Sequence, residues 1–242
     1  MSEVAFTYDW YERMLDALVD AGLETGPFDG PVDDRTLLLR HDVDWSPRKA
    51  VRLARMERRA GFSATFFFMT SSPFYNARDR YCRDAIDRIL DLGHEVGLHF
   101  STHQYWDERS SADAVESRVA EERRLLEDVA AEDASVVSFH NPPEWVLRES
   151  FSGFTSTYEP RFFDRIEYRA DSNQRWRDEH PFEAGVPGPL QVLTHPVLWG
   201  EVDGSGVDRV REERDFVFER LQSFIAETYH PWPDGDGVPE VE

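Results

Sequence analysis

Residues 36–69 read TLLLRHDVDWSPRKAVRLARMERRAGFSATFFFM, and the expected fold follows mainly from this segment. It opens on an apolar run over 36–40 that is typical of a buried strand. Ser46 and Pro47 then supply an N-cap and a proline at the first helical position, which predicts a helix to about residue 59. A second strand-sized apolar run follows over 64–69. A strand, a helix and another strand in this order predict a parallel βαβ unit.

The same alternation continues along the chain. Helices are expected over 8–23, 80–92, 112–131 and 207–228, and strands over 94–100, 135–140, 166–171 and 190–194. This pattern predicts an α/β fold with a parallel sheet and helical crossovers. No linker or repeat interrupts it, so we expect one domain overall. It has a helix and lead-in over 1–35, a catalytic unit over 36–229 and an acidic, Pro/Gly-rich tail over 230–242.

Ionisable side chains collect where the predicted strands end. They are Asp42 and Asp44 after the first strand, His99 and His103 at the third, and His140, Asp171 and His195 at later ones. In parallel α/β barrels the carboxyl ends of the strands lie on one rim, and the active site is built there. We therefore expect these groups to converge.

Two of these motifs indicate a metal site. His99 and His103 have i,i+4 spacing, which places both imidazoles on one side of a helical turn. A carboxylate from elsewhere would complete a three-ligand site with an open position for water. By itself, a histidine pair with this spacing is as often structural as metal-binding. The Asp42-Val43-Asp44 motif favours metal, although it is also typical of a helix N-terminus and of the DxD motif in nucleotide-sugar glycosyltransferases.

The amino-acid composition disfavours several classes of binding partner. The chain has 242 residues, with 27 basic against 48 acidic side chains, a formal charge of −21. Nucleic acids and anionic membrane surfaces are disfavoured, because both require a basic surface. The single cysteine, Cys82, allows no internal disulfide, and we expect neither a secretory signal nor a membrane span. The acid-rich surface with one lysine, Lys49, predicts a cytoplasmic protein of a high-salt organism.

Taken in order, five motifs resemble those of the polysaccharide deacetylase family, the NodB-like carbohydrate esterases. RHDVD at 40–44 looks like the first motif in its Asp-x-Asp form, and GHEVGLHFSTH at 93–103 is similar to the second. FHNPP at 139–143 falls where the family has an Arg-Pro-Pro segment. DSNQRW at 171–176 and LTHP at 193–196 look like the fourth and fifth motifs.

The resemblance implies a deformed (β/α) barrel of about seven parallel strands. It also implies metal-dependent hydrolysis of an N-acetyl group on an amino sugar of a polysaccharide, oligosaccharide or glycan precursor. By resemblance, the divalent ion, zinc or another first-row metal, is held by Asp44, His99 and His103. Asp42 is then the general base, and His195 is the general acid, oriented by Asp171.

Two departures bear on the resemblance. The first motif has an inserted Val43 relative to the adjacent Asp-Asp form, which leaves the split of roles between Asp42 and Asp44 open. His140 stands where the family usually has an arginine that steers the base aspartate, so His140 is expected to support the site in another way. Trp176 lies near a rim loop, where stacking on a sugar and packing below the loop are both open. Other expectations are hydrolysis of a different non-peptide C–N bond, a non-catalytic carbohydrate-binding domain, or a glycosyltransferase. The oligomeric state is left open.

Overall fold

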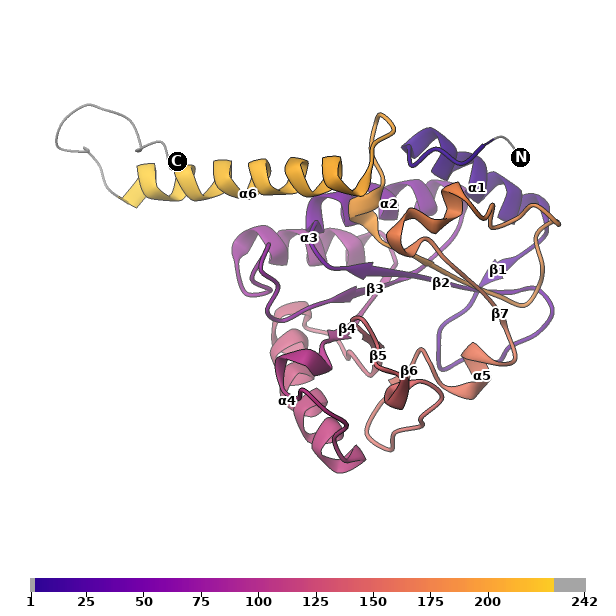
Figure 1. Cartoon of the computed structure of the whole chain (residues 1–242), viewed down its shortest axis with the longest axis horizontal. Coiled ribbons are helices and arrows are strands. Elements are labelled where there is room, and N and C mark those ends of the chain that lie inside the picture. The colour runs from indigo at the N-terminus through magenta and orange to yellow at the C-terminus, as the bar shows by residue number, and fades with distance from the viewer. Residues whose placement is uncertain (1–2, 229–242) are drawn as a thin grey trace.

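The computed structural model describes residues 3–228, and its centre is one parallel sheet (Figure 1). The strand order is β6-β5-β4-β3-β2-β8-β7, and every neighbouring pair is parallel. These strands are β2 (Thr36–Val43), β3 (Thr65–Phe68), β4 (Glu95–Phe100), β5 (Val136–Phe139), β6 (Thr155–Ser156), β7 (Glu167–Ala170) and β8 (Leu190–Thr194). Within residues 3–228 no pairing joins β6 to β7, so the seven strands form a half-barrel. The predicted deformed barrel is confirmed.

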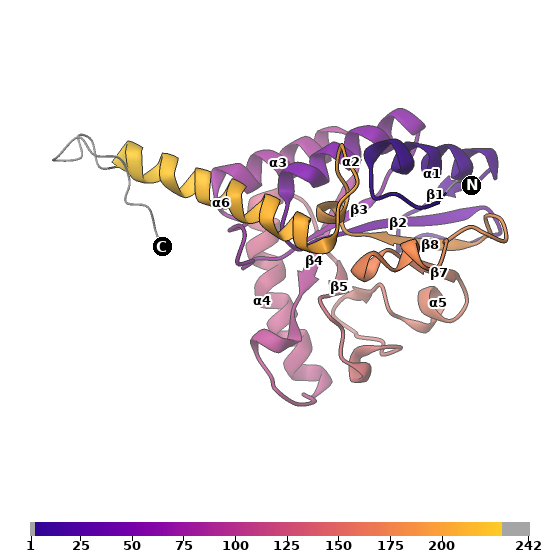
Figure 2. The same ribbon diagram turned by 45° about the horizontal axis from the view of Figure 1, so that its top comes forward.

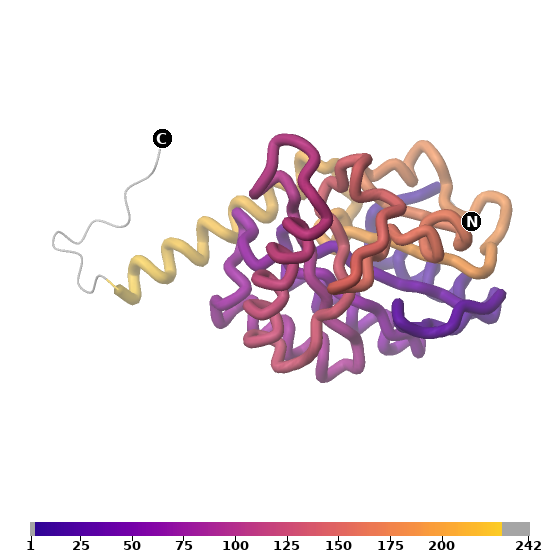
Figure 3. Tube along the Cα trace, turned by 90° about the horizontal axis from the view of Figure 1, so that it is seen from below, coloured from indigo at the N-terminus to yellow at the C-terminus, as the bar shows by residue number. Residues whose placement is uncertain are grey.

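The described residues also form six α-helices. They are α1 (Tyr8–Asp20), α2 (Pro47–Ala60), α3 (Arg80–Asp91), α4 (Ala112–Ala130), α5 (Pro160–Phe163) and α6 (Gly206–Thr228). Figure 2 shows α1, α2 and α3 side by side over one face of the sheet. In Figure 3 the far half of α6 extends away from the rest of the molecule. The predicted tail over 230–242 lies outside the described residues.

Besides the 3-10 helices, three short elements have no counterpart among the sequence predictions: β1 (Glu24–Thr25), β6 and α5. Each spans four residues or fewer, too short for a hydrophobic period to show. The strand predicted over 36–40 also continues to Val43. Its pairing with β3 runs on through Asp42 opposite Phe67, because the apolar partner strand continues there.

Strand β2 presents polar side chains to both faces of the sheet, since successive residues point in opposite directions. Arg40 and Asp42 face the interior of the half-barrel, while His41 faces the helices. His41 Nδ1 lies 2.7 Å from Thr194 Oγ1, and its Nε2 lies 2.7 Å from Glu57 Oε1. His41 is thus a buried structural histidine that ties β2 to β8 and α2.

Gly97 on β4 leaves room for the side chain of Phe67, its partner on the neighbouring strand β3. A Cβ at this position would lie 2.5 Å from Phe67 Cε1 and 2.8 Å from the Val136 carbonyl oxygen. We expect Gly97→Ala to lower the free energy of unfolding by about 1–3 kcal/mol, as overpacking does. Gly206→Ala is the control, because nothing lies within 4 Å of its added Cβ. Urea unfolding measures the free energy of unfolding of both variants. Equal values for Gly97→Ala and Gly206→Ala would contradict the prediction.

Candidate active site

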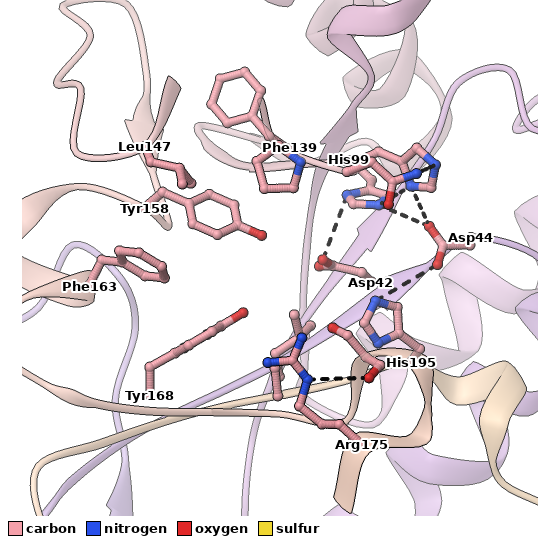
Figure 4. Close-up of a pocket in the computed structure, with 16 residues that line it drawn as sticks. Asp42, Asp44, His99, Phe139, Leu147, Tyr158, Phe163, Tyr168, Arg175 and His195 are labelled. Carbon is pink, nitrogen blue, oxygen red and sulfur yellow. Dashed lines mark hydrogen bonds and ion pairs between the residues drawn. The ribbon is translucent and has the colours of Figure 1, made fainter. Parts of the chain in front are cut away.

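The carboxyl ends of four strands bring together the ionisable residues that the sequence places there. β2 leads to Asp42 and Asp44, β4 contains His99, and β5 and β8 are followed by His140 and His195. Figure 4 shows Asp42, Asp44, His99 and His195 gathered at one end of a cavity. The parallel order of the strands explains this convergence, because all of them end on the same rim.

Asp44, His99 and His140 form a compact group of three possible metal ligands. Their ligand atoms all lie within 4.8 Å of one another. Asp44 Oδ1 is 3.0 Å from His99 Nε2 and 2.9 Å from His140 Nδ1, and the two histidine nitrogens are 3.2 Å apart. Burial raises the pKa of Asp44, but hydrogen bonds from His140 and His99 hold it below its ordinary value. One carboxylate and two imidazoles are a donor set that zinc and related ions accept.

The surroundings of both histidines fit ligand roles. His99 Nδ1 lies 3.1 Å from the Ser138 carbonyl oxygen and can donate its proton there, so Nε2 could offer a lone pair to an ion that replaced its contact with Asp44. Metal-bound histidines typically donate their second N–H in this way. His140 Nε2 lies 3.0 Å from the side-chain amide of Asn141. Turned to present its oxygen, that amide would accept the Nε2 proton, and His140 Nδ1 could then offer a lone pair to an ion in place of its contact with Asp44.

The structure places two predicted site residues elsewhere. His103 is exposed, its Nε2 lies 3.0 Å from the Asn141 carbonyl oxygen, and it is not part of the three-ligand group. It follows β4 on a 3-10 turn, η1 (Thr102–Gln104), and not on the α-helical turn that i,i+4 spacing assumes. Trp176 is 2% exposed and packs against Trp10 and Trp199, which leaves no open ring face for a sugar.

Asp42 has two carboxylate oxygens in different surroundings. Oδ2 accepts a hydrogen bond from Ser138 Oγ at 3.0 Å and one from Arg40 at 3.4 Å. Oδ1 is buried and has no hydrogen-bond partner within residues 3–228. Asp42 also lines the cavity.

His195 and Asp171 form a tightly held pair beside this site. His195 Nδ1 lies 2.6 Å from Asp171 Oδ1, and Trp199 Nε1 donates to Asp171 Oδ2 at 2.9 Å. His195 Nε2 faces the site, 3.9 Å from Asp44 Oδ2. Burial lowers the pKa of His195, but the Asp171 carboxylate outweighs it and raises that pKa to about 9. His195 is therefore protonated at neutral pH, as a general acid must be.

Removing the Asp171 charge should move the alkaline limit of activity. The pKa of His195 is raised from 6.5 to about 9, so its acid form is present below pH 9 and lost above it. Asp171→Asn keeps the shape but not the charge, so we expect kcat to fall about 10–100-fold and the alkaline limb to move to lower pH. Profiles of kcat against pH measure this. A limb that stays in place would contradict the role of Asp171.

Two cavities meet at the polar group. The smaller, about 310 Å³, extends past Asp42 between the side chains of Leu147, Tyr158, Phe163 and Tyr168 (Figure 4). The larger, about 650 Å³, lies toward Ser172–Arg177 and the start of α6. Asp44, His140 and His195 line both cavities. A substrate can thus place a bond at the polar group with a part of the molecule on each side.

The sequence reading left out three residues of this site: Arg40, Ser138 and Tyr158. Arg40 and Ser138 bind Asp42 directly, and Tyr158 Oη accepts from Arg40 at 2.8 Å. Arg40 precedes Asp42 by two residues on one strand, so strand alternation puts both on one face. Strand alternation could therefore have identified Arg40 as a neighbour of Asp42 from the sequence. No pattern marked Ser138 or Tyr158.

Comparison with models of protein families finds a match for part of the chain. A family profile described as "Polysaccharide deacetylase" matches residues 29–144. Residues 29–144 belong to the polysaccharide deacetylase family. The resemblance drawn from the motifs is confirmed. This family comprises metal-dependent carbohydrate deacetylases and also includes pseudoenzymes.

Solved structures similar to this chain include a deacetylase, an esterase and a pseudoenzyme. A CE4 family pseudoenzyme from Bacillus anthracis is 17% identical, with a TM-score of 0.43; the match covers 79% of this chain and 63% of that one. This chain thus spans less than two thirds of that protein. Peptidoglycan deacetylase PdaC from Bacillus subtilis is 13% identical, with a TM-score of 0.46 and coverage of 81% and 98%. A family 4 acetyl xylan esterase from Clostridium thermocellum, in complex with a cobalt ion, is 16% identical, with a TM-score of 0.40 and coverage of 78% and 84%.

Comparison with curated proteins finds no match. Among residues 3–228, none of the helices has the length and apolar character needed to cross a bilayer.

Proposed function

We propose that this polysaccharide deacetylase family protein is an active metal-dependent hydrolase that removes the acetyl group from an N-acetylated amino sugar. The observation that carries the proposal is the group of Asp44, His99 and His140, with Asp42 and His195 beside it. In the proposed ligand set, Asp44, His99 and His140 hold the divalent ion. When bound, that ion supplies Lewis-acid activation of the amide carbonyl and of water.

The protein's own residues supply the proton transfers. Asp42 Oδ1 takes the proton from the attacking water, because Oδ2 is already occupied by Ser138 and Arg40. His195 then gives its Nε2 proton to the amine, which is too basic to leave as an anion. Asp171 holds the His195 ring in place and keeps it protonated until that step.

The two cavities suggest separate binding places for the acyl group and the sugar of the substrate. The apolar side chains of Leu147 and Phe163 suit the acyl group, and the larger cavity suits the sugar. The smaller cavity, about 310 Å³, has room for an acyl group larger than acetyl. Acetyl and longer N-acyl chains are therefore both included in the test.

An acyl-release assay tests the proposal. The full chain, loaded separately with zinc, cobalt and manganese, is incubated with N-acetylglucosamine oligomers and their N-propionyl and N-butyryl analogues. We expect metal-dependent release of the free acid that stops when a chelator removes the ion. Metal binding without release from any of these compounds would contradict N-deacylation and favour a pseudoenzyme or a different C–N substrate. Allantoin and N-formyl compounds in the same panel distinguish those two outcomes.

A further inference from the structure

Arg40 is a buried arginine in the interior of the half-barrel, at 0% exposure. Its Nη2 lies 3.4 Å from Asp42 Oδ2 and donates to Tyr158 Oη at 2.8 Å, while Nη1 donates to Gln191 Oε1 at 3.2 Å. Within residues 3–228, Asp42 is the only carboxylate that forms an ion pair with it. A buried charge is costly unless it is paired, so the Arg40–Asp42 pair offsets the burial of both groups.

The guanidinium group is held on several sides. Tyr158 lies under it, with 4.7 Å between the guanidinium carbon and the ring centroid. Tyr158 comes from the segment after β6, and Gln191 comes from β8, so two parts of the fold fix one side chain. Figure 4 shows the Tyr158 hydroxyl pointing toward the side of the cavity where Asp42 lies. A planar group held in this way presents its N–H bonds in a fixed direction.

The two oxygens of Asp42 are unequal because of these contacts. Arg40 and Ser138 both bind Oδ2, and Oδ1 is left without a partner among the described residues. The arginine expected after β5 from the family's third motif is absent, since His140 stands there and lies beside Asp44. The guanidinium group next to Asp42 thus comes from β2, two residues before Asp42 itself, and His99 Nδ1 on β4 lies 4.0 Å from the same oxygen.

We propose that Arg40 is a positioning residue that holds Asp42 Oδ2 and so directs Oδ1 at the reacting water. This inference rests on the proposed function, in which Asp42 is the base. Arg40 takes the place of the third-motif arginine, and this leaves the position of His140 available for a metal ligand.

Kinetics with chemical rescue test the inference. Arg40→Ala leaves a space that a guanidinium ion can enter, and Arg40→Lys keeps the charge but not the planar fork. We expect kcat to fall about 10–100-fold in both variants, with KM and bound metal near wild type, and guanidinium chloride at millimolar concentration to restore part of the loss in Arg40→Ala. An unchanged kcat, or a fall that guanidinium does not reverse, would overturn the role.

Arg209→Ala is the matched control. Arg209 is also a buried arginine, at 4% exposure, and it donates to the Leu198, Phe6 and Val202 carbonyl oxygens, away from Asp42. Its loss should lower stability without any guanidinium-dependent change in kcat. Equal rescue in both variants would show a general effect of guanidinium and overturn the inference.

Crystal structures of the wild type and of Arg40→Lys separate this inference from the proposed function. We expect the Asp42 carboxylate in the variant to turn away from its wild-type orientation or to occupy several. An unchanged Asp42 would overturn the positioning role. If the wild type releases no acyl group, the proposed function fails, and the orientation of Asp42 still decides whether Arg40 positions it.

Discussion

His140→Ala should lower the affinity for a divalent ion by more than about 100-fold, beyond the 10–100-fold that loss of an outer partner of a ligand costs. The reason is that His140 Nδ1 lies 2.9 Å from Asp44 and 3.2 Å from His99 Nε2, as a member of the three-ligand group. Metal-dependent turnover should be lost with the ion. Titration calorimetry with zinc and cobalt measures the affinity directly.

His103→Ala is the matched control for this prediction. His103 has the motif spacing of a ligand, but it is exposed and its Nε2 is directed at the Asn141 carbonyl oxygen. We therefore expect His103→Ala to bind the ion with close to wild-type affinity. If His103→Ala loses the ion and His140→Ala keeps it, the ligand set proposed from the structure is wrong, and the set implied by the motif resemblance is correct.

Asp42→Asn should lower kcat by about 10²–10⁴-fold, the range that a general base contributes. Asparagine keeps the size of the side chain, and its amide can still contact Ser138, but it cannot take a proton from water. Bound metal and KM should stay near wild type, because Asp42 is not part of the three-ligand group. Steady-state kinetics together with metal analysis measure both.

Asp34→Asn serves as the control, since Asp34 is an exposed aspartate on the loop before β2. It should be indistinguishable from wild type in kcat and in metal content. An Asp42→Asn protein that keeps full kcat would remove Asp42 from the chemistry. It would also remove the basis for a positioning role of Arg40 in catalysis.

The fold could be predicted from the sequence to a large extent. The helix at Pro47–Ala60 begins at a proline and ends at a glycine in the left-handed region, and these local signals are in the sequence. The strand Leu190–Thr194 was expected with the same bounds, because a short apolar run between breakers leaves few alternatives. The two-residue strand β6 was missed because its pairing with β5 depends on contacts distant in sequence.

The candidate site was predictable only in part. That Asp42, Asp44, His99, Asp171 and His195 would converge followed from their places at strand ends, since parallel strands end on one rim. The strand ends did not show which second histidine lies beside Asp44 and His99. Spacing put His103 beside His99, whereas the direction of the chain after β5 puts His140 there.

Sequence patterns alone were enough to predict the parallel α/β order, the rim on which the ionisable groups lie and the family relationship. The folded structure was needed to show that His140 lies beside Asp44 and His99. It also showed that Arg40 and Ser138 bind the same oxygen of Asp42 and that Trp176 is buried. The physical reason is that strand alternation and spacing fix the face and end of an element on which a side chain lies. Its contact partners come from other strands, and their approach depends on how the whole sheet curls.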